Sequence, residues 1–451
     1  MINTKALREK ILDLAMRGKL VVPDLTKEKT DIFETEKQGY LPQNWVLTSL
    51  SNVATLLNGR AYKKNELLSN ERLTPVLRVG NLFTNSQWYY SDLNLDSNKY
   101  IDNGDLIYAW SASFGPRIWN GGKAIYHYHI WKISLRFEES KKFMYYFLLD
   151  NAKKVKKNTT GSTMVHITKR KMEQMKVPFP PLEEQKRIVA KLEELFALID
   201  TIESNQLEFK QLAEQLDKKV LDLAMRGKLV PQNPTDEPAS VLLDEIKEEK
   251  EQLIKDKKVK KEKPLPEISK EEIPYEIPDS WEWVRLVDIG SIFSGGTPKT
   301  TINEFWEKGT IPWITPAIMG KSKSKIFNSV ALKHITEQGL NASSAQLIPG
   351  SSIVYSSRAP IGHINIVPYP YSTNQGCKSV TPIKVDVDYL YYCLVFRTPD
   401  IKKRASGTTF KEISGKGFSM TVVSIPPLAE QKRIVAKIEM IRESIQRIDF
   451  E

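Results

Sequence analysis

Residues 180–191 read PPLEEQKRIVAK, and residues 426–437 read PPLAEQKRIVAK. Eleven of the twelve positions are identical, although the two copies lie 246 residues apart. Proline is accepted in the first turn of a helix but not in its interior, so each proline pair indicates a helix start. The repeated stretch therefore predicts two matching helices.

The similarity extends upstream of both copies. The stretch TGSTMVHI at 160–167 corresponds to SGTTFKEI at 406–413, and LPQNWVLTSL at 41–50 resembles IPDSWEWVRL at 277–286. The repeated unit is thus a module of about 140 residues followed by PPLxEQKRIVAK, which indicates a duplication and not a solenoid. A second repeat has a different offset, because LDLAMRGKLV occurs at both 12–21 and 221–230.

Apolar residues recur at alternating steps of four and three after the first PPLEEQ. The series runs through Ile188, Leu192, Leu195, Ile199, Ile202, Gln206, Phe209, Ala213, Leu216, Val220 and Leu223. Such a heptad pattern over 36 residues is typical of a coiled coil about 54 Å long. The alternative is an ordinary amphipathic helix lying on a globular core.

The second copy repeats only the start of this pattern before the sequence stops. Its apolar positions are Ile434, Ile438, Ile441, Ile445 and Ile448. The offset of the second repeat places Thr4, Leu7, Ile11 and Leu14 at the positions that would continue it. We therefore expect the two ends of the chain to meet and form a split helix antiparallel to the central one, in a circular pseudo-twofold arrangement. The alternative is that the ends pair between different molecules.

Composition indicates a soluble, cytoplasmic protein, and its positive charge is concentrated in two segments. Among the 451 residues are two cysteines, no apolar run long enough to span a bilayer and no apparent secretion signal. The net charge of +11 is unevenly distributed: residues 40–178 hold 20 basic against 10 acidic residues, residues 275–425 hold 16 against 11, and the remainder hold 30 against 34. Two basic segments are typical of two surfaces that bind an anionic polymer, although solubility alone could explain the charge.

Both modules combine short β-like runs with a Tyr-rich helical stretch, so we expect two α+β globules. Their loops carry polar and basic side chains of the kinds that contact DNA phosphates and base edges. The alternative for each one is an ordinary solvated loop position. The candidates for DNA binding in the first module are Arg60, Lys63, Arg78, Asn81, Ser111, Ser113, Arg117, Thr160, Ser162, Thr163, His166 and Lys169. Those in the second module are Thr297, Lys299, Lys323, Lys325, Arg358, Gln375, Thr408, Thr409 and Lys411.

Recognisable catalytic motifs are missing from the sequence. The five histidines and two cysteines have no metal-ligand spacing, and His127 and His129 are interpreted as neighbours on one face of a strand. No GxxxxGK[ST] phosphate loop occurs. We therefore expect a protein without catalysis or metal of its own, with an enzyme carrying an unrecognised site as the alternative.

Two basic modules, each followed by PPLxEQKRIVAK and a heptad helix, together with AMRGKL at 15–20 and 224–229, resemble the specificity subunit of type I restriction-modification enzymes. The resemblance covers essentially the whole chain. It implies two target recognition domains, each reading one half of a split, asymmetric DNA sequence, and an antiparallel coiled coil that sets their spacing. It also implies two methyltransferase subunits and restriction subunits as partners. S-adenosylmethionine, ATP and Mg would belong to those partners and not to this chain.

On this reading the chain has five parts. They are an N-terminal segment at 1–22, a target recognition domain at 40–178, a central helical region at 180–263, a second target recognition domain at 275–425 and a C-terminal helix at 426–451. A coiled-coil scaffold that binds only proteins is the competing interpretation.

Overall fold

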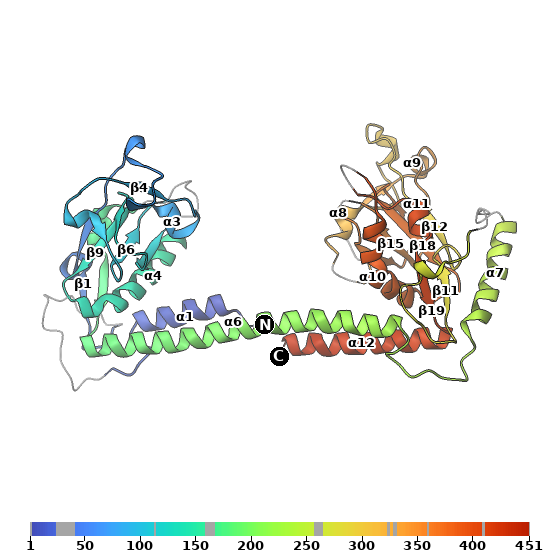
Figure 1. Ribbon diagram of the computed structural model, residues 1–451, viewed down its shortest axis with the longest axis horizontal. Coiled ribbons are helices and arrows are strands. Elements are labelled where there is room, and N and C mark those ends of the chain that lie inside the picture. Colours follow the sequence, from blue (N-terminus) through green and yellow to red (C-terminus); the bar gives the residue numbers. More distant parts are fainter. Residues whose placement is uncertain are drawn as a thin grey trace. The chain divides into compact units, whose positions relative to one another are not determined.

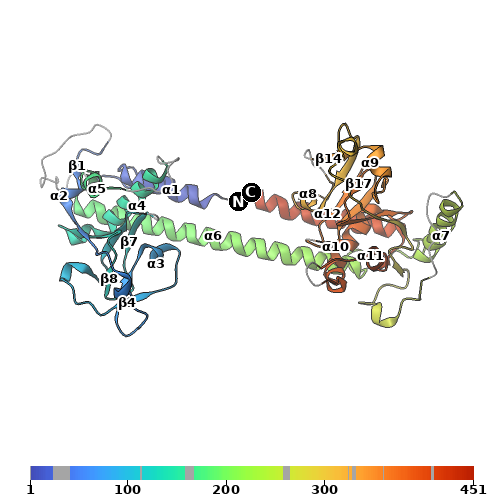
Figure 2. The same ribbon diagram turned by 90° about the horizontal axis from the view of Figure 1, so that it is seen from above.

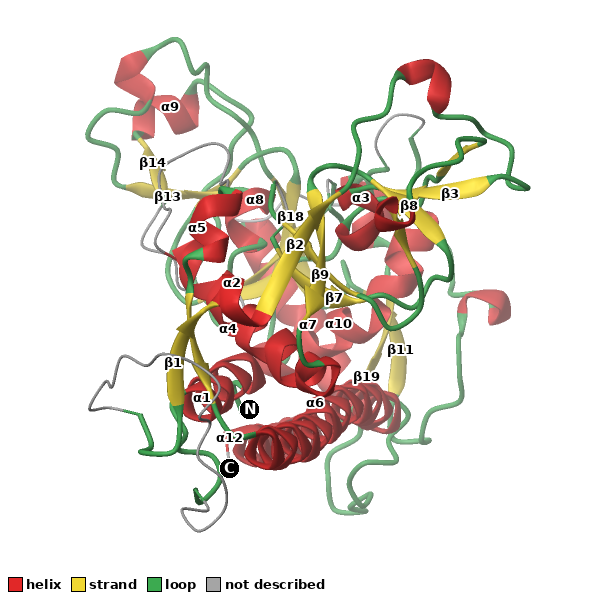
Figure 3. Cartoon of the chain, turned by 90° about the vertical axis from the view of Figure 1, so that its left-hand side faces the viewer, coloured by secondary structure: helices red, strands yellow, loops and turns green. Residues whose placement is uncertain are grey.

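The structure is a computed structural model that describes residues 2–23, 41–111, 114–157, 167–256, 265–322, 325–327, 332–358, 360–407 and 411–450. The chain divides into two compact units, Met1–Leu207 and Glu208–Glu451. Each unit contains one globular module and a pair of packed helices (Figure 1). Both modules contain helices as well as strands (Figure 3). The predicted α+β class, with two globular domains and long helices, is confirmed.

The first module has two four-stranded sheets, ordered β2-β9-β6-β7 and β4-β3-β8-β5, and a strand pair, β1-β10, that joins its two ends. Its strands are β1 (Val46–Ser49), β2 (Ala54–Asn58), β3 (Thr74–Leu77), β4 (Tyr89–Ser91), β5 (Tyr100–Ile101), β6 (Leu106–Ala109), β7 (Gly115–Ile118), β8 (Ala124–Tyr126), β9 (Ile130–Leu135) and β10 (Lys176–Phe179). Its α-helices are α2 (Leu50–Val53), α3 (Val79–Phe83), α4 (Lys141–Lys157) and α5 (Lys169–Glu173).

The second module repeats this layout, with sheets ordered β12-β18-β15-β16 and β14-β13-β17 and a closing pair, β11-β19. Its strands are β11 (Glu282–Arg285), β12 (Gly290–Ser294), β13 (Ile311–Ile314), β14 (Lys333–Ile335), β15 (Ser352–Ser356), β16 (Ile364–Val367), β17 (Ser372–Thr373), β18 (Cys377–Pro382) and β19 (Val422–Ile425). Its α-helices are α8 (Pro316–Met319), α9 (Glu337–Asn341), α10 (Val387–Arg404) and α11 (Gly415–Ser419).

The α-helices outside the modules, in the part of the chain that the structure describes, are α1 (Thr4–Met16), α6 (Leu182–Met225), α7 (Ala239–Lys255) and α12 (Leu428–Phe450). Within the first unit α1 runs antiparallel to α6, because Gln206 of α6 bonds the Ile2 carbonyl whereas Arg187 bonds the Val22 carbonyl. Figure 2 shows the two helices side by side. Within the second unit α12 packs on the later part of α6. Whether the two ends of the chain meet stays a prediction.

Most of the predicted seam residues of these helices are buried or half-buried. Ile188, Leu192, Ile199, Ile434 and Ile438 are buried, and Leu195, Ile202, Ile441 and Ile445 are half-buried. The heptad extrapolation is wrong at Leu7, Leu216 and Ile448, which are 37%, 46% and 61% exposed. Beside Leu216, Asp217 turns inward to bond Arg442. This part of α6 packs on α12 within the second unit.

Equivalent positions in the two helix pairs carry different charges. In the second unit Arg442 of α12 makes two bonds with Asp217 of α6, at 2.6 and 3.0 Å, and lies 4.8 Å from the Tyr392 ring. The repeat offsets place Phe196 and Arg8 at the corresponding sites of the first unit, where Arg8 lies 5.3 Å from the Phe196 ring. The side chains of each helix pair are therefore complementary within their own unit. A helix pair that joined Arg8 with Arg442 would instead bring two positive charges together.

We expect Arg442→Asp to destabilise the second unit by about 1–2 kcal/mol, because a bidentate ion pair becomes a like-charge contact. Reversing both charges, in Asp217→Arg with Arg442→Asp, should recover most of the loss. Urea unfolding measures both effects. Arg447→Asp on the same helix is the control, since Arg447 is 80% exposed and should change stability by no more than about 0.5 kcal/mol. A double variant no more stable than Arg442→Asp would contradict the prediction.

The repeated PPLxEQ residues attach each module to its helices. Glu184 and Glu430 are buried, and each accepts a bond from a tryptophan indole: Trp45 at 2.8 Å and Trp281 at 2.9 Å. The side chain of the next residue in each copy bends back toward the prolines. The side-chain amides of Gln185 and Gln431 donate to the carbonyls of Pro180 and Pro426 at 2.8 and 2.9 Å. We call the pair Glu184–Trp45 the junction of the first unit and the pair Glu430–Trp281 the junction of the second.

The AMRGKL repeat ends at the same two junctions. Gly18 and Gly227 have φ of +66° and +65°, and a Cβ atom at either would lie 2.4 Å from the Cγ of Pro42 or Pro278. A left-handed conformation and this close approach both favour glycine. The two repeats of different offset therefore converge on one duplicated contact within each unit.

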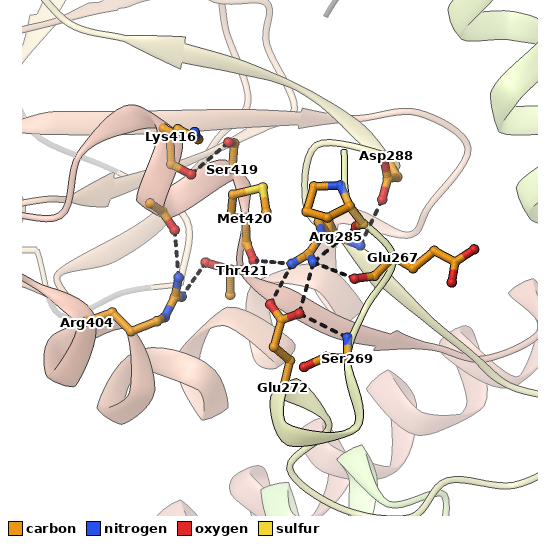
Figure 4. A network of polar contacts seen from close by, with 12 residues as sticks. Glu267, Ser269, Glu272, Arg285, Asp288, Arg404, Lys416, Ser419, Met420 and Thr421 are labelled. Carbon is orange, nitrogen blue, oxygen red and sulfur yellow. Dashed lines mark hydrogen bonds and ion pairs between the residues drawn. The ribbon is translucent and has the colours of Figure 1, made fainter. Parts of the chain in front are cut away.

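Arg285 fixes the segment before the second module in place. Its side chain is 2% exposed and makes two bonds with Glu272, at 2.9 and 3.0 Å. The same guanidinium reaches the carbonyls of Pro266 and Glu267 at 3.3 and 3.4 Å (Figure 4). The buried Arg285 cation thus holds residues 266–272 against the strand pair β11-β19.

Candidate nucleic-acid interface

The described strands of each module include a parallel pair, and a turn follows its second strand. Leu77 lies opposite Tyr126 in the pair β3–β8, and Ile314 lies opposite Thr373 in the pair β13–β17. The turns are residues 127–129, reading HYH, and residues 374–376, reading NQG. Polar side chains at the carboxyl ends of parallel strands converge at one edge, where α/β proteins often place binding sites.

The two turns correspond residue by residue. The amide of Arg60 bonds the Tyr126 carbonyl at 3.0 Å, as that of Gly296 bonds the Thr373 carbonyl at 2.9 Å. After the turns, Ile130 pairs with Ala109 and Cys377 pairs with Ser356. These pairings place Tyr128 and Gln375 at the same position, and both side chains are exposed.

A cavity of about 150 Å³ lies beside the first turn. It is lined by Arg78, Val79, Gly80, Asn81, Asn85, Gln87, His127 and His129. The Asn81 side chain shapes this site, because it accepts a bond from the Arg78 amide at 3.1 Å and donates to the Gln87 carbonyl at 2.8 Å. The Arg78 guanidinium lies 5.4 Å from the Tyr89 ring centroid.

His127 is neutral at physiological pH. Burial lowers its pKa to about 4, and the nearby His129 and Arg78 act in the same direction. Its Nδ1 atom accepts a bond from the His129 amide at 3.4 Å, which places the proton on Nε2. The cavity therefore combines a neutral imidazole with an arginine cation, a mixture suited to base edges and phosphates.

In the second module, three predicted residues come together at the turn. The Thr297 hydroxyl donates to Oε1 of Gln375. Nε of Arg358 lies 3.2 Å from the position of a Cβ atom at Gly376, the last residue of the turn. The Arg358 guanidinium is 3.9 Å from the Glu412 carboxylate, so its charge is only loosely paired.

Other predicted residues make structural contacts. Arg60 forms a bidentate pair with Glu66, at 2.8 and 3.2 Å, and the Lys63 amide bonds the same carboxylate. Burial opposes the charge of Lys325, yet its ion pairs with Asp388 and Glu439 hold its pKa above the ordinary value. Whether these side chains also contact DNA stays a prediction.

The remaining described candidates are placed as follows. Ser111 is buried, and the Arg117 guanidinium lies 5.1 Å from the Phe83 ring centroid. Lys169 lies 3.7 Å from Glu173 on α5. Lys299 and Lys411 are exposed. The candidates outside the described residues are Ser113, Thr160, Ser162, Thr163, His166, Lys323, Thr408 and Thr409.

The interpretation of His127 and His129 as a strand-face pair is wrong. Strand β8 ends at Tyr126 and β9 begins at Ile130, so both histidines lie in the turn between them. Tyr128, which separates them, was not predicted as a site residue although it is 40% exposed. The polar pattern HYH between two apolar runs was the available signal for a turn.

Among the described residues, no group of three His, Cys, Asp or Glu side chains is arranged to hold a metal ion. Cys377 and Cys393 are buried free thiols. None of the helices in the described ranges combines the length and the apolar character needed to cross a membrane.

Comparisons with known proteins agree on one family. Residues 42–209 and 278–448 match the type I restriction modification DNA specificity domain. The specificity subunit of the type I restriction enzyme EcoAI from Escherichia coli is 26% identical over 99% of this chain and 90% of its own length. That of MjaIX from Methanocaldococcus jannaschii is 34% identical over 38% of this chain and 40% of its own.

Two solved structures share the fold. A structure described as concerning complex assembly and conformational transition of the type I R-M system has a TM-score of 0.59 at 20% identity, covering 90% of this chain and 92% of the other. The HsdS subunit from Thermoanaerobacter tengcongensis has a TM-score of 0.52 at 18% identity, covering 90% and 91%.

Proposed function

This chain belongs to the type I restriction modification DNA specificity family, and we propose that it recognises a bipartite, asymmetric DNA target. In this proposal each module reads one half-site in the major groove, and the helices connect the two readers. The chain directs methyltransferase and restriction subunits to the target. Recognition by the linked pair exceeds that by either module alone, because linkage raises the effective concentration of the second half-site.

The observation that carries this proposal is the duplicated turn at the end of the parallel strand pair. The backbone pairings are the same in both modules, but the side chains differ: His127, Tyr128 and His129 in one, Asn374, Gln375 and Gly376 in the other. The same backbone with different side chains in the turn is suited to two modules that recognise different DNA sequences. The excess of positive charge in both modules supports binding to the phosphate backbone.

Catalysis is assigned to the partners in this proposal. The chain acts as a recognition component without a reaction of its own, and S-adenosylmethionine, ATP and Mg serve the methyltransferase and restriction subunits. We place the assembly in the cytoplasm, where it meets DNA.

The test is to map methylated adenines in DNA from cells that produce this chain with its methyltransferase partners. We expect a single motif with two separated half-sites of different sequence. Replacing residues 40–178 with the corresponding module of a relative should change one half-site and leave the other intact. A map without a bipartite motif contradicts the proposal, and a change in both half-sites contradicts the assignment of one module to each.

A protein-only scaffold predicts a different result in a second measurement. DNA affinity of the assembled complex should fall linearly with salt concentration on a double-logarithmic plot if the modules neutralise phosphates. Absent binding would favour the scaffold instead.

A further inference from the structure

Gln375 combines exposure with a fixed orientation. It is the exposed tip of the turn 374–376, whereas Gly376 next to it is buried. The Thr297 hydroxyl donates to Oε1 of its side chain, and Nζ of Lys378 donates to its backbone carbonyl at 3.3 Å. Both the amide plane and the backbone of this residue are therefore held before any ligand arrives.

The backbone under the tip is also held closely. The Asn374 amide bonds the Ile314 carbonyl at 3.0 Å, and its side chain accepts a bond from the Gly376 amide at 3.0 Å. A Cβ atom at Gly295 would lie 1.8 Å from the Asn374 carbonyl oxygen, so only glycine allows the two segments to approach so closely. Thr297 follows two residues later and reaches Gln375 because of this approach.

The chemistry of the tip matches one base better than the others. A glutamine amide can accept a bond from N6 and donate one to N7 of adenine, which together distinguish adenine in the major groove. The bond from Thr297 uses one lone pair of Oε1 and leaves the second lone pair, together with the Nε2 hydrogens, directed by the same amide plane. Arg358, beside the turn, supplies positive charge for a neighbouring phosphate.

We propose that Gln375 is the side chain with which the second module reads an adenine of its half-site, and that Thr297 is its positioning residue. This inference rests on the proposed function, because it assumes that the second module reads DNA. In the first module the equivalent tip is Tyr128, which lacks an amide. The two half-sites therefore differ at the base pair beneath this position.

The experiment uses the full chain assembled with its methyltransferase partners and a pool of duplexes randomised within each half-site. We expect Gln375→Ala to reduce the preference for adenine over the other bases by roughly 5- to 150-fold, at one position of one half-site. Gln375→Glu should move that preference toward cytosine, because a carboxylate accepts a bond from cytosine N4. The other half-site should be unchanged in both variants.

Thr297→Val tests the positioning role at the same base pair. It should weaken discrimination at that position only, and Thr297→Ser, which keeps the hydroxyl, should restore it. Gln338→Ala is the matched control, because Gln338 is an exposed glutamine of the same module that belongs to α9 and not to the turn. It should leave the selected motif unchanged.

The outcomes separate this inference from the function on which it rests. If the unmodified chain selects a bipartite motif and Gln375→Ala selects the same motif with equal stringency, the inference is overturned and the proposed function stands. A Gln375→Ala effect spread over both half-sites also overturns it. If the unmodified chain selects no bipartite motif, the proposed function itself fails.

Discussion

Gly18→Ala should destabilise the first unit by about 2–5 kcal/mol. The left-handed conformation at φ +66° costs a residue with a side chain about 1–2 kcal/mol, and overpacking costs about 1–3 kcal/mol more. The overpacking arises because the new methyl group would lie 2.4 Å from the Cγ of Pro42 and 3.2 Å from the Trp45 ring. Urea unfolding followed by tryptophan fluorescence measures the loss.

Gly122→Ala separates the two contributions. Gly122 lies in the same unit and has a φ of +75°, but a Cβ atom there would meet nothing within 4 Å. It should therefore cost only the conformational part, about 1–2 kcal/mol. Gly227→Ala repeats the test in the second unit, where Pro278 lies 2.4 Å from the new methyl group. If Gly18→Ala and Gly122→Ala cost the same, the contact with Pro42 relaxes and the junction is not tightly packed.

The junctions matter for function because they join each reading module to its helices. The indole of Trp281 donates to Glu430, and Gln232 from the segment after α6 donates to the same carboxylate at 2.6 Å. Burial raises the pKa of Glu430, and these two bonds oppose the rise. A weakened junction would let the module rotate relative to the helix. This rotation would lower the sequence specificity at one half-site although every residue that contacts a base is unchanged.

The repeated motifs predicted the duplicated architecture because they encode buried contacts. Ile188 and Ile434 are fully buried, and the paired residues Glu184 and Glu430 are nearly so. Periodicity, however, could not show that these glutamates bind Trp45 and Trp281, since the partners lie far away in sequence. The close approach of Gly18 to Pro42 was equally hidden, because such a contact is visible only once both residues are placed.

The candidate site was less predictable, for a physical reason. Loop residues have no periodic burial, so Arg60, Lys325 and Gln375 look alike in sequence as polar side chains of a basic module. The structure separates them by their partners: Arg60 is paired with Glu66 and Lys325 with Asp388, while Gln375 is oriented by a hydroxyl and exposed. Tyr128 was missed because the sequence predicted DNA contacts from polar and basic loop residues, and an aromatic side chain is not one of them.

Arg285→Met should destabilise the second unit by about 2–4 kcal/mol. Removing one partner of a buried ion pair costs about 3–5 kcal/mol, and the loss is smaller here because the Glu272 side chain is 40% exposed and can be resolvated. The carbonyls of Pro266, Glu267 and Met420 also lose their donor (Figure 4). Arg285→Met with Glu272→Leu is the matched control, because an apolar pair leaves no carboxylate unpaired and should recover part of the stability.

The same pair makes stability depend on acid pH. Bonds from Arg285 and from the Ser269 amide lower the pKa of Glu272 from its ordinary 4.5 to about 2. A lowered folded-state pKa gives stability that is complete above about pH 4.5 and is lost as the pH falls toward 2. The stability difference between the unmodified chain and Arg285→Met, measured by urea unfolding at a series of pH values, should therefore shrink across this window. A difference that stays constant from pH 6 to pH 3 would show that Arg285 acts through its backbone carbonyl contacts and not through the charge of Glu272.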